Sequence, residues 1–295
     1  MKIKEKTIEG FILNWSDVFI LKYLFLLIAF NHLSNKNINS CLFSISMIKQ
    51  SFIFLPGISN KKEQNVWNQG INSWDSFINA KNLQGFSKRS KSFCDFHLEK
   101  AKKALNADDS LYFHKRMPNV EAWRLYNHFK DDVCFLDIET VGYNGYVTVV
   151  GLYDGFDTKI MVKDINLNMK VLKQELSKYK LLVTFNGSSF DLPVLQKYYP
   201  GSVPKIAHID LRHACRKVGL VGGLKMIEEE VGIKRPDHLK AMGGDQAIKL
   251  WRAYRASGDK EYLDLLVQYN EEDIVNLKPL MGHVYDKLKN QIKIT

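Results

Sequence analysis

The side chains with the clearest potential for chemistry lie in three short motifs. These read Asp-Ile-Glu at residues 137–139, Asn-Gly-Ser-Ser-Phe-Asp at 186–191 and Tyr-Asn-Glu-Glu-Asp at 269–273. Carboxylate oxygens are the ligands that hard divalent cations such as Mg²⁺ prefer, and several together suit phosphodiester hydrolysis with two metal ions. The candidate catalytic residues are Asp137, Glu139, Asp191, Tyr269 and Asp273, and the four acids are also the candidate metal ligands.

The elements expected around the first and third motifs direct their side chains to one place. Residues 133–139 read as an apolar strand, on which Asp137 and Glu139 are two residues apart and therefore share a face. Tyr269 and Asp273 are four residues apart in a helical stretch, so they share one side of that helix.

The second motif follows another predicted strand, at residues 180–185. Asn186-Gly187 is a strong turn signal, and either Ser188 or Ser189 can cap the helix that follows. Asp191 is then expected in the first turn of that helix, beside the end of its strand. Two strands and two helices are thus predicted to converge on one pocket.

Each motif alone also has an ordinary structural interpretation. A lone Asp-x-Glu is commonly a solvated strand end, and an acid near a helix start commonly stabilises the helix N-terminus. Tyr269 could be a core residue, with Asp273 on the surface. The occurrence of all three motifs, in order and on converging elements, favours a functional site.

The three motifs resemble those of the DEDD superfamily of 3′–5′ exonucleases, whose catalytic domain has a ribonuclease H-like fold. The family pattern is Asp-x-Glu, then Asn-x-x-x-(Phe/Tyr)-Asp, then either Tyr-x-x-x-Asp or His-x-x-x-x-Asp. Gln268 occupies the position of that histidine, so the chain resembles the tyrosine subclass. Residues near 112 to 290 look closest to the YprB-type ribonuclease H-like group, which the runs Trp123-Arg124-Leu125-Tyr126, His208-Ile209-Asp210-Leu211-Arg212 and Gly222-Gly223-Leu224-Lys225 also fit.

The resemblance implies a site for two Mg²⁺ or Mn²⁺ ions. Asp137 would bridge both ions, and Glu139 and Asp273 would complete one coordination shell. Asp191 would hold the second ion, partly through water. Four carboxylates this close repel one another, which raises their pKa values unless cations neutralise them.

The resemblance also implies roles for three other side chains. Tyr269 would orient the attacking water, or help to deprotonate it, through its hydroxyl group. Asn186 and Phe190 are the candidate substrate-binding residues, since they would shape the turn and the surface under the terminal nucleotide.

Other acidic positions have simpler explanations. Asp210 could approach the metal site, or it could cap a helix that begins near Leu211. The run of acids at residues 228–230 is assigned to a solvated helix face. Histidine and cysteine spacings give no zinc pattern, and no glycine-rich nucleotide-binding loop is present, so no further cofactor is expected.

The charge of the chain favours a nucleic-acid partner, either DNA or RNA. The net charge is +10, and residues 1–118 hold 17 Lys and Arg against 9 Asp and Glu. The remaining residues hold 25 against 23, so the excess positive charge lies mainly before the motifs. That part is expected to supply much of the grip on phosphates, although basic clusters are also ordinary solvated surface.

The order of predicted elements gives an α/β fold, with a ribonuclease H-like mixed sheet flanked by helices and preceded by a small all-helical module. We expect the sheet domain at residues 111–295 and the helical module at 47–110. Residues 1–46 form an apolar extension that could be a core helix, a peripheral membrane helix or an upstream segment outside the folded enzyme. Strands are expected at 133–140, 146–154, 158–163, 180–186 and 205–209, and helices at 168–178, 189–199, 211–218, 222–231, 243–256, 260–268 and 270–290.

Two features of the helical module suggest contact with nucleic acid. Residues 54–59, Phe-Leu-Pro-Gly-Ile-Ser, resemble half of a helix-hairpin-helix element, which binds phosphate at a helix N-terminus, although Ser59 replaces the usual second glycine. A plain helix start is the alternative explanation, and the partial match favours it. Residues 87–104 form a basic helix that could line a substrate channel.

The sequence therefore predicts a metal-dependent 3′–5′ exonuclease of DNA or RNA. An endonuclease with the same metal site, or a non-catalytic nucleic-acid-binding protein, are the alternatives. No membrane partner is expected, because the apolar stretch at residues 18–30 is too short to span a bilayer. The oligomeric state is left open. A cytoplasmic location is expected from four cysteines without disulfide or metal spacing, Cys41, Cys94, Cys134 and Cys215.

Overall fold

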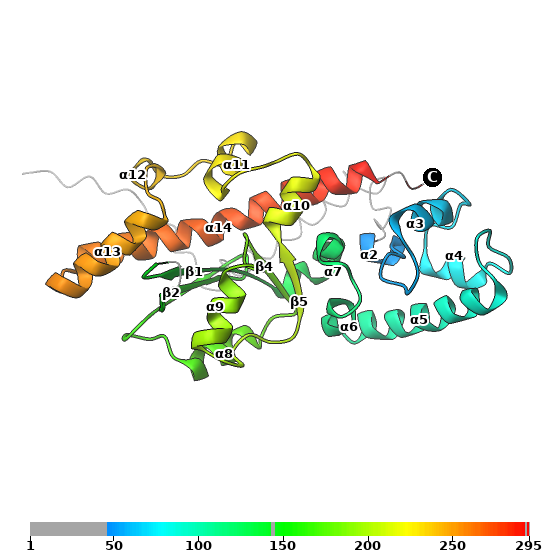
Figure 1. Ribbon diagram of the computed structural model, residues 1–295, viewed down its shortest axis with the longest axis horizontal. Coiled ribbons are helices and arrows are strands. Elements are labelled where there is room, and N and C mark those ends of the chain that lie inside the picture. The colour runs from blue at the N-terminus through cyan, green and yellow to red at the C-terminus, as the bar shows by residue number, and fades with distance from the viewer. Residues whose placement is uncertain (1–45, 143–144, 293, 295) are drawn as a thin grey trace, which may run out of the picture. The chain divides into compact units, whose positions relative to one another are not determined.

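A computed structural model describes residues 46–142, 145–292 and 294 of the 295-residue chain (Figure 1). The predicted apolar extension at residues 1–46 lies outside the described residues, except for Ser46. Within the described part, no helix is both long enough and apolar enough to cross a bilayer.

Helices alone make up the segment before the sheet, as predicted. Several of them begin at a serine whose hydroxyl accepts a backbone N–H three residues later, which compensates the unpaired donors of a helix start. Ser59 is one of these caps, so the predicted helix start at the end of the Phe-Leu-Pro-Gly-Ile-Ser run is confirmed, while phosphate binding there stays a prediction. The helices are α2 (Met47–Gln50), α3 (Asn60–Trp67), α4 (Trp74–Asn79), α5 (Lys88–Asn106) and α6 (Ser110–His114).

A buried ion pair joins this segment to the 3₁₀ helix η1 (Asn119–Leu125). Arg124 of η1 contacts both carboxylate oxygens of Glu63 at 2.9 Å, and both side chains are almost fully buried. Glu63 also accepts the backbone N–H groups of Phe52 and Ile53. One apolar core accordingly continues from α2 through η1 to the sheet.

The sheet contains both parallel and antiparallel strands, which confirms the predicted mixed α/β architecture. The strand order is β3-β2-β1-β4-β5, with β1 in the centre. β1 pairs antiparallel with β2 and parallel with β4, while β4 pairs parallel with β5 and β2 antiparallel with β3. The strands are β1 (Val133–Thr140), β2 (Val147–Tyr153), β3 (Thr158–Val162), β4 (Leu181–Thr184) and β5 (Ala207–Asp210).

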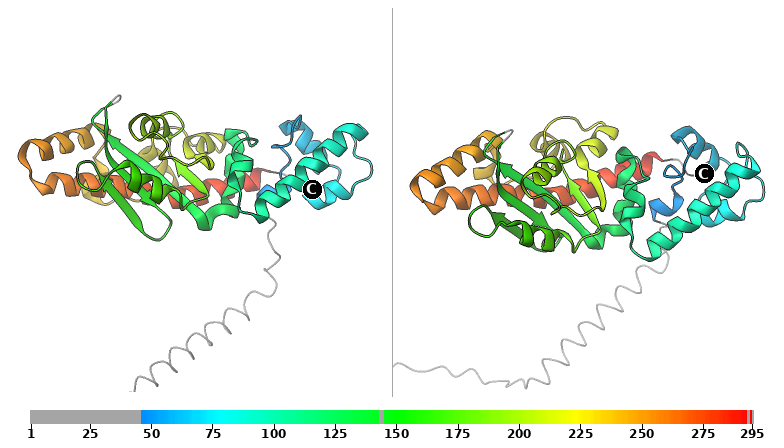
Figure 2. Two further views of the ribbon diagram at one scale, coloured as in Figure 1. Left: turned by 90° about the horizontal axis from the view of Figure 1, so that it is seen from below. Right: turned by 60° about the horizontal axis from the view of Figure 1, so that its bottom comes forward.

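Alternate residues of β1 pack on opposite faces of the sheet. Val133 and Phe135 join the core beneath α14 (Lys260–Gln291), whereas Cys134, Leu136 and Ile138 join the core beneath α8 (Met169–Leu176) and α9 (Asp191–Tyr198). Because side chains alternate along a strand, residues 137 and 139 face α14. The turned views in Figure 2 show α14, drawn from orange to red, running beside the green sheet.

The C-terminal part is helical, and α14 is its longest element. The sequence predicts two helices, at 260–268 and 270–290, but a single helix spans Lys260–Gln291, so this prediction is wrong. Asn270, the first residue of the second predicted helix, is fully buried between helix and sheet, where packing outweighs its weak helix propensity. The remaining helices are α7 (Tyr126–Phe129), η2 (Lys130–Asp132), α10 (Leu211–Lys217), α11 (Leu224–Val231), α12 (Asp237–Lys240) and α13 (Gly244–Ser257).

Gly151 of β2 allows α14 to approach the sheet closely. It lies opposite Asp137 in the antiparallel pair. A Cβ atom at this position would be 2.1 Å from the Oδ1 atom of Asn270 and 3.2 Å from Ile274 of α14. The missing side chain therefore sets the distance between α14 and the strand that carries the first motif.

We predict that Gly151→Ala destabilises the protein by about 1–3 kcal/mol, because the added methyl group overpacks the contact between helix and sheet. Urea unfolding followed by circular dichroism measures this change. Gly282→Ala is the matched control on α14, since a Cβ atom there meets no atom within 4 Å and alanine favours a helix. An unfolding free energy of Gly151→Ala equal to that of the unmodified chain would contradict the close packing.

Candidate active site

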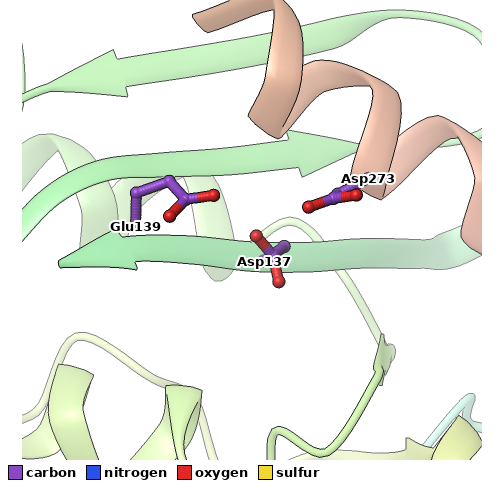
Figure 3. A group of neighbouring side chains, drawn as sticks. All are labelled: Asp137, Glu139 and Asp273. Atoms are coloured by element: carbon purple, nitrogen blue, oxygen red, sulfur yellow. The ribbon is translucent and has the colours of Figure 1, made fainter. Parts of the chain in front are cut away.

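Three carboxylates from two elements form one compact group. Asp137 and Glu139 project from β1, and Asp273 projects from α14 toward them (Figure 3). One carboxylate oxygen of each lies within 4.8 Å of those of the other two, an arrangement that can hold a metal ion. The predicted convergence of the first and third motifs is thus present in the structure.

Asp191, the fourth predicted ligand, lies next to this group but outside it. It is the first residue of α9, as expected, and its Oδ1 atom accepts the backbone N–H of Ile138 at 3.1 Å. That N–H belongs to the residue between Asp137 and Glu139. The predicted serine cap is wrong, because Phe190 occupies the N-cap position and no side chain caps α9.

Mutual repulsion and burial raise the pKa values of the grouped acids. For Asp137, the removal of water is the largest cause, followed by the negative charges of Asp191 and Asp273. The pKa of Glu139 is raised in the same way, with Asp273 as its strongest charged neighbour. Burial also raises the pKa of Asp273, although a neighbouring arginine acts against it.

Asp191 has its pKa raised to about 7. Burial is the main cause, and the charges of Asp210 and Asp273 add to it. Hydrogen bonds from backbone N–H groups, that of Ile138 among them, favour the ionised form and limit the shift.

Asn270 positions the central acid of the group. Its Nδ2 atom donates to the Oδ2 atom of Asp137 at 2.9 Å, and the amide is fully buried above Gly151. A neutral donor in this position holds the carboxylate in place without supplying a full positive charge, so Asp137 stays available to a cation.

Arg235 balances the charge of Asp273. Its Nη2 atom lies 2.5 Å from the Oδ1 atom of Asp273, and its other contacts go to the carboxylate of Glu228. All three side chains are buried. The prediction that Glu228 belongs to a solvated helix face is therefore wrong, because a buried arginine between two helices pairs with it, while Glu229 and Glu230 are exposed.

Tyr269 and Lys225 lie beside the acids. Tyr269 is one turn before Asp273 on α14 and is mostly buried. Burial, followed by the charges of Asp273 and Glu139, raises the pKa of the Tyr269 hydroxyl, so it remains protonated at neutral pH. The Nζ atom of Lys225 lies 5.0 Å from the centre of the Tyr269 ring.

The turn that carries the second motif is fixed by Asp210. Its two carboxylate oxygens accept the backbone N–H groups of Asn186, Ser188 and Arg212. Burial acts to raise the pKa of Asp210, but the hydrogen bonds from Ser188 and Asn186 outweigh it, and the pKa lies below the ordinary value. The cap interpretation of Asp210 is confirmed, since it caps α10.

The two predicted substrate-binding residues flank this turn. Asn186 adopts a left-handed backbone conformation, with φ of 67°, which asparagine tolerates better than most residues. Its Oδ1 atom accepts a hydrogen bond from Arg212. Phe190 is half-buried and borders a hollow of about 190 Å³, together with Pro193, Lys197 and Tyr198.

Sequence reasoning missed three residues that support the acids. Asn270 follows Tyr269 directly, so its place in the third motif was a usable signal. Lys225 belongs to the Gly-Gly-Leu-Lys run, which carried the resemblance but no assigned role. Arg235 has no local signal, because its partners Glu228 and Asp273 meet it only in the folded chain.

The site fits a divalent cation by the chemistry of its donors. Oxygen atoms of three carboxylates face one another, and burial and mutual repulsion disfavour their ionised forms unless positive charge is added. Of the three acids, only Asp273 pairs with Arg235, which it shares with Glu228. Asp137 and Glu139 have no ion pair with a basic side chain within the described residues, which leaves charge for a metal ion to neutralise.

We predict that the metal-free protein loses stability as the pH rises from 5 to 8. The folded-state pKa of Asp191, about 7, lies above the unfolded value of about 3.9, so its contribution is complete below the unfolded value and is lost as the pH passes 7. Asp191→Asn removes this titration but keeps an acceptor for the Ile138 N–H. The stability of the variant relative to the unmodified chain should therefore increase by roughly 2–3 kcal/mol from pH 5 to pH 8.

Urea unfolding in EDTA at both pH values measures this difference. Asp264→Asn, an exposed position on the same helix as Asp273, is the control and should give the same difference at both pH values. A pH-independent difference for Asp191→Asn would show that burial and repulsion do not raise the pKa of Asp191.

Comparison with known proteins agrees with this geometry. A family model described as the RNase_H superfamily matches residues 134–285, just over half of the chain, and the matched region begins in β1 and ends near the end of α14. No curated protein matches the chain. The matched region contains all four acids and Tyr269, and the mixed sheet is that of a ribonuclease H-like, nuclease-type fold. The chain belongs to the RNase_H superfamily.

Proposed function

We propose that the protein is a metal-dependent 3′–5′ exonuclease of the DEDD superfamily, in its tyrosine subclass, and that it is closest to the YprB-type group. The observation that carries this proposal is the group of Asp137, Glu139 and Asp273 within 4.8 Å, with Tyr269 one helical turn from Asp273. A binding protein has no use for three carboxylates, two of them buried, held in mutual repulsion.

Two Mg²⁺ or Mn²⁺ ions would be held by the four acids. Asp137, which Asn270 holds in place, would bind metal together with Glu139 and Asp273, and Asp191 would support a second ion. Bound divalent cations supply a water of lowered pKa and neutralise charge that develops on the phosphate. The chain itself supplies carboxylates that are already fixed in place, so they need no reorganisation when the substrate binds.

Tyr269 would position the attacking water by hydrogen bonding. Its raised pKa excludes the phenolate form at neutral pH, so the hydroxyl acts as a directional donor or acceptor and not as a strong base. Its ring is held between α14 and the Nζ atom of Lys225, which limits its motion.

Phe190 is suited to contact the terminal nucleotide. The hollow that it borders runs along one side of α9, Phe190 directly precedes Asp191 in the chain, and the half-buried ring offers a surface for stacking a base. Lys197, which lines the same hollow, adds positive charge near the phosphates.

The outer face of α5 supports a grip on a single strand. Phe93 and Phe96 are each about half exposed, at 50% and 53%, and Arg89 and Lys100 lie on the same helix at the spacing of successive turns. Aromatic rings between basic side chains can stack bases and hold phosphates without reading sequence. Lys91 and Lys102 of this helix do not add to the grip, since they pair with Asp95 and with Asp75 and Glu99.

We predict that end-labelled DNA or RNA oligonucleotides are shortened stepwise from the 3′ end in Mg²⁺ or Mn²⁺, and not in EDTA. Asp137→Asn should lower the rate by at least about 100-fold, because even residues that merely support metal ligands cost 10–100-fold when they are changed. Gel electrophoresis of the products measures both results, and circular dichroism checks the fold of the variant.

Asp264→Asn is the control and should cleave at the rate of the unmodified chain. Discrete internal products would favour an endonuclease with the same site. Cleavage that persists in EDTA, or at full rate in Asp137→Asn, would exclude the proposed mechanism, and binding without any cleavage would favour a non-catalytic protein.

We predict that Tyr269→Phe lowers kcat by about 10–100-fold with little change in KM, because the ring and its packing remain while the hydroxyl is removed. Steady-state cleavage of a labelled oligonucleotide measures both constants. The decrease should be smaller than that of Asp137→Asn. A Phe variant with an unchanged kcat would mean that Tyr269 only fills the core.

A further inference from the structure

A second, basic cavity lies directly beside the acidic group. It has a volume of about 210 Å³ and is formed by α11, the loop that follows it and the end of α12. Figure 1 shows these two helices on the same side of α14. The side chains that give it charge are Lys225, Lys234, Arg235 and Lys240, together with Glu228 and Glu229.

The charge of this cavity is positive after internal pairing, because Lys225 and Lys234 outnumber Glu229, the one lining acid without an ion pair within the described residues. The Nε and Nη2 atoms of Arg235 donate to the two carboxylate oxygens of Glu228 at 2.5 and 2.8 Å. Lys240 forms an ion pair with Asp237 at the exposed rim of the cavity. The Nζ atom of Lys225 donates to the carbonyl oxygen of Leu239, a neutral acceptor, at 3.4 Å. Neither Lys225 nor Lys234 forms an ion pair with a carboxylate within the described residues, so both retain their charge for an anion.

Arg235 gives an independent indication of an anionic ligand. Its side chain is almost fully buried, with 7% of the residue exposed, and its Nε and Nη2 atoms are occupied by Glu228 and Asp273. The Nη1 atom is buried and has no hydrogen-bond partner within the described part of the chain. A buried guanidinium donor without a partner is unfavourable, and a ligand oxygen in the adjoining cavity would satisfy it.

Arg235 also places the cavity relative to the candidate metal site. The same guanidinium that lines the cavity contacts Asp273, and Lys225 lies close enough to act electrostatically on Glu139 and Asp273. An anion in the cavity would therefore be a neighbour of any phosphate bound at the acids. Successive phosphates of one nucleic-acid strand have this relationship.

We propose that this cavity, lined by Lys225, Lys234, Arg235 and Lys240, is a subsite for a backbone phosphate of the substrate strand, next to the phosphate at the acidic group. The assignment rests on the proposed nuclease function and extends it, because it assigns α11 and α12 to the strand path. Positive charge on this side also offsets the repulsion between the acids and an approaching polyanion.

The test measures binding of fluorescein-labelled single-stranded DNA and RNA to the full chain in EDTA, where no cleavage occurs. Lys234→Gln/Lys240→Gln should bind about 5- to 20-fold more weakly, and the slope of log K against log salt should fall by about 0.7 for each phosphate that is no longer neutralised. Lys170→Gln/Lys173→Gln removes the same charge from exposed positions on α8 and should change neither value.

A second measurement locates the subsite along the strand. Oligonucleotides with one neutral methylphosphonate linkage, moved stepwise from the 3′ end, should show one position that weakens binding to the unmodified chain. Binding to Lys234→Gln/Lys240→Gln should be insensitive at that position, because the variant no longer neutralises the phosphate there.

Three outcomes would overturn the subsite. These are unchanged oligonucleotide affinity in Lys234→Gln/Lys240→Gln, equally weakened binding in the test and control pairs, or the same methylphosphonate profile in both proteins. If one of these outcomes is observed and the unmodified chain still cleaves oligonucleotides in Mn²⁺, only the subsite proposal is rejected. If the unmodified chain neither binds nor cleaves nucleic acid, the proposed function fails as well.

Discussion

Repulsion between carboxylates that the fold holds close together is the constraint on which the rest of the site depends. Asp137, Glu139 and Asp273 would separate if they were free in solution. The central strand β1 and the long helix α14 prevent this, since both are fixed by buried apolar contacts along their whole length. Because added positive charge relieves this repulsion, the arrangement has an affinity for cations.

The side chains next to the three acids differ in the positive charge that they supply. Asn270 gives Asp137 a neutral donor, Arg235 gives Asp273 a full positive charge, and Lys225 acts on Glu139 from a greater distance. As a result, the negative charges of Asp137 and Glu139 are less neutralised than that of Asp273. Added positive charge is therefore most favourable near Asp137 and Glu139, while Asp273 is already stabilised by Arg235 before any ligand binds.

Most of the architecture could be predicted, because its signals are local. The alternation of apolar residues along β1 placed Asp137 and Glu139 on one face, and the spacing of Tyr269 and Asp273 placed both on one side of a helix. The errors arose where tertiary contacts override local preference. Two helices are predicted at 260–268 and 270–290, yet α14 is continuous, and Asn270 within it is buried against Gly151.

The residues that support the site could not be predicted for a related reason. Glu228 resembles a surface acid in the sequence, and only the folded chain brings it to Arg235 and thereby to Asp273. Likewise, the choice between a cap and a metal ligand for Asp210 depended on the path of the turn at Asn186, which no spacing specifies. The candidate catalytic side chains occur in short sequence motifs. The residues that neutralise their charge are brought to them only by contacts between distant parts of the chain.

The buried pair of Glu63 and Arg124 couples the N-terminal helices to the sheet. Residue 63 precedes the sheet by some 70 positions in the chain, and yet its carboxylate is the partner of a guanidinium in the shared core. If the chain were shortened past α3, Arg124 would lose Glu63 and keep Glu121 of η1 as its remaining carboxylate partner, at 2.8 Å. The helices α2 and α3 therefore share both a buried ion pair and an apolar core with the nuclease-type sheet, and removing them would uncover one side of that core.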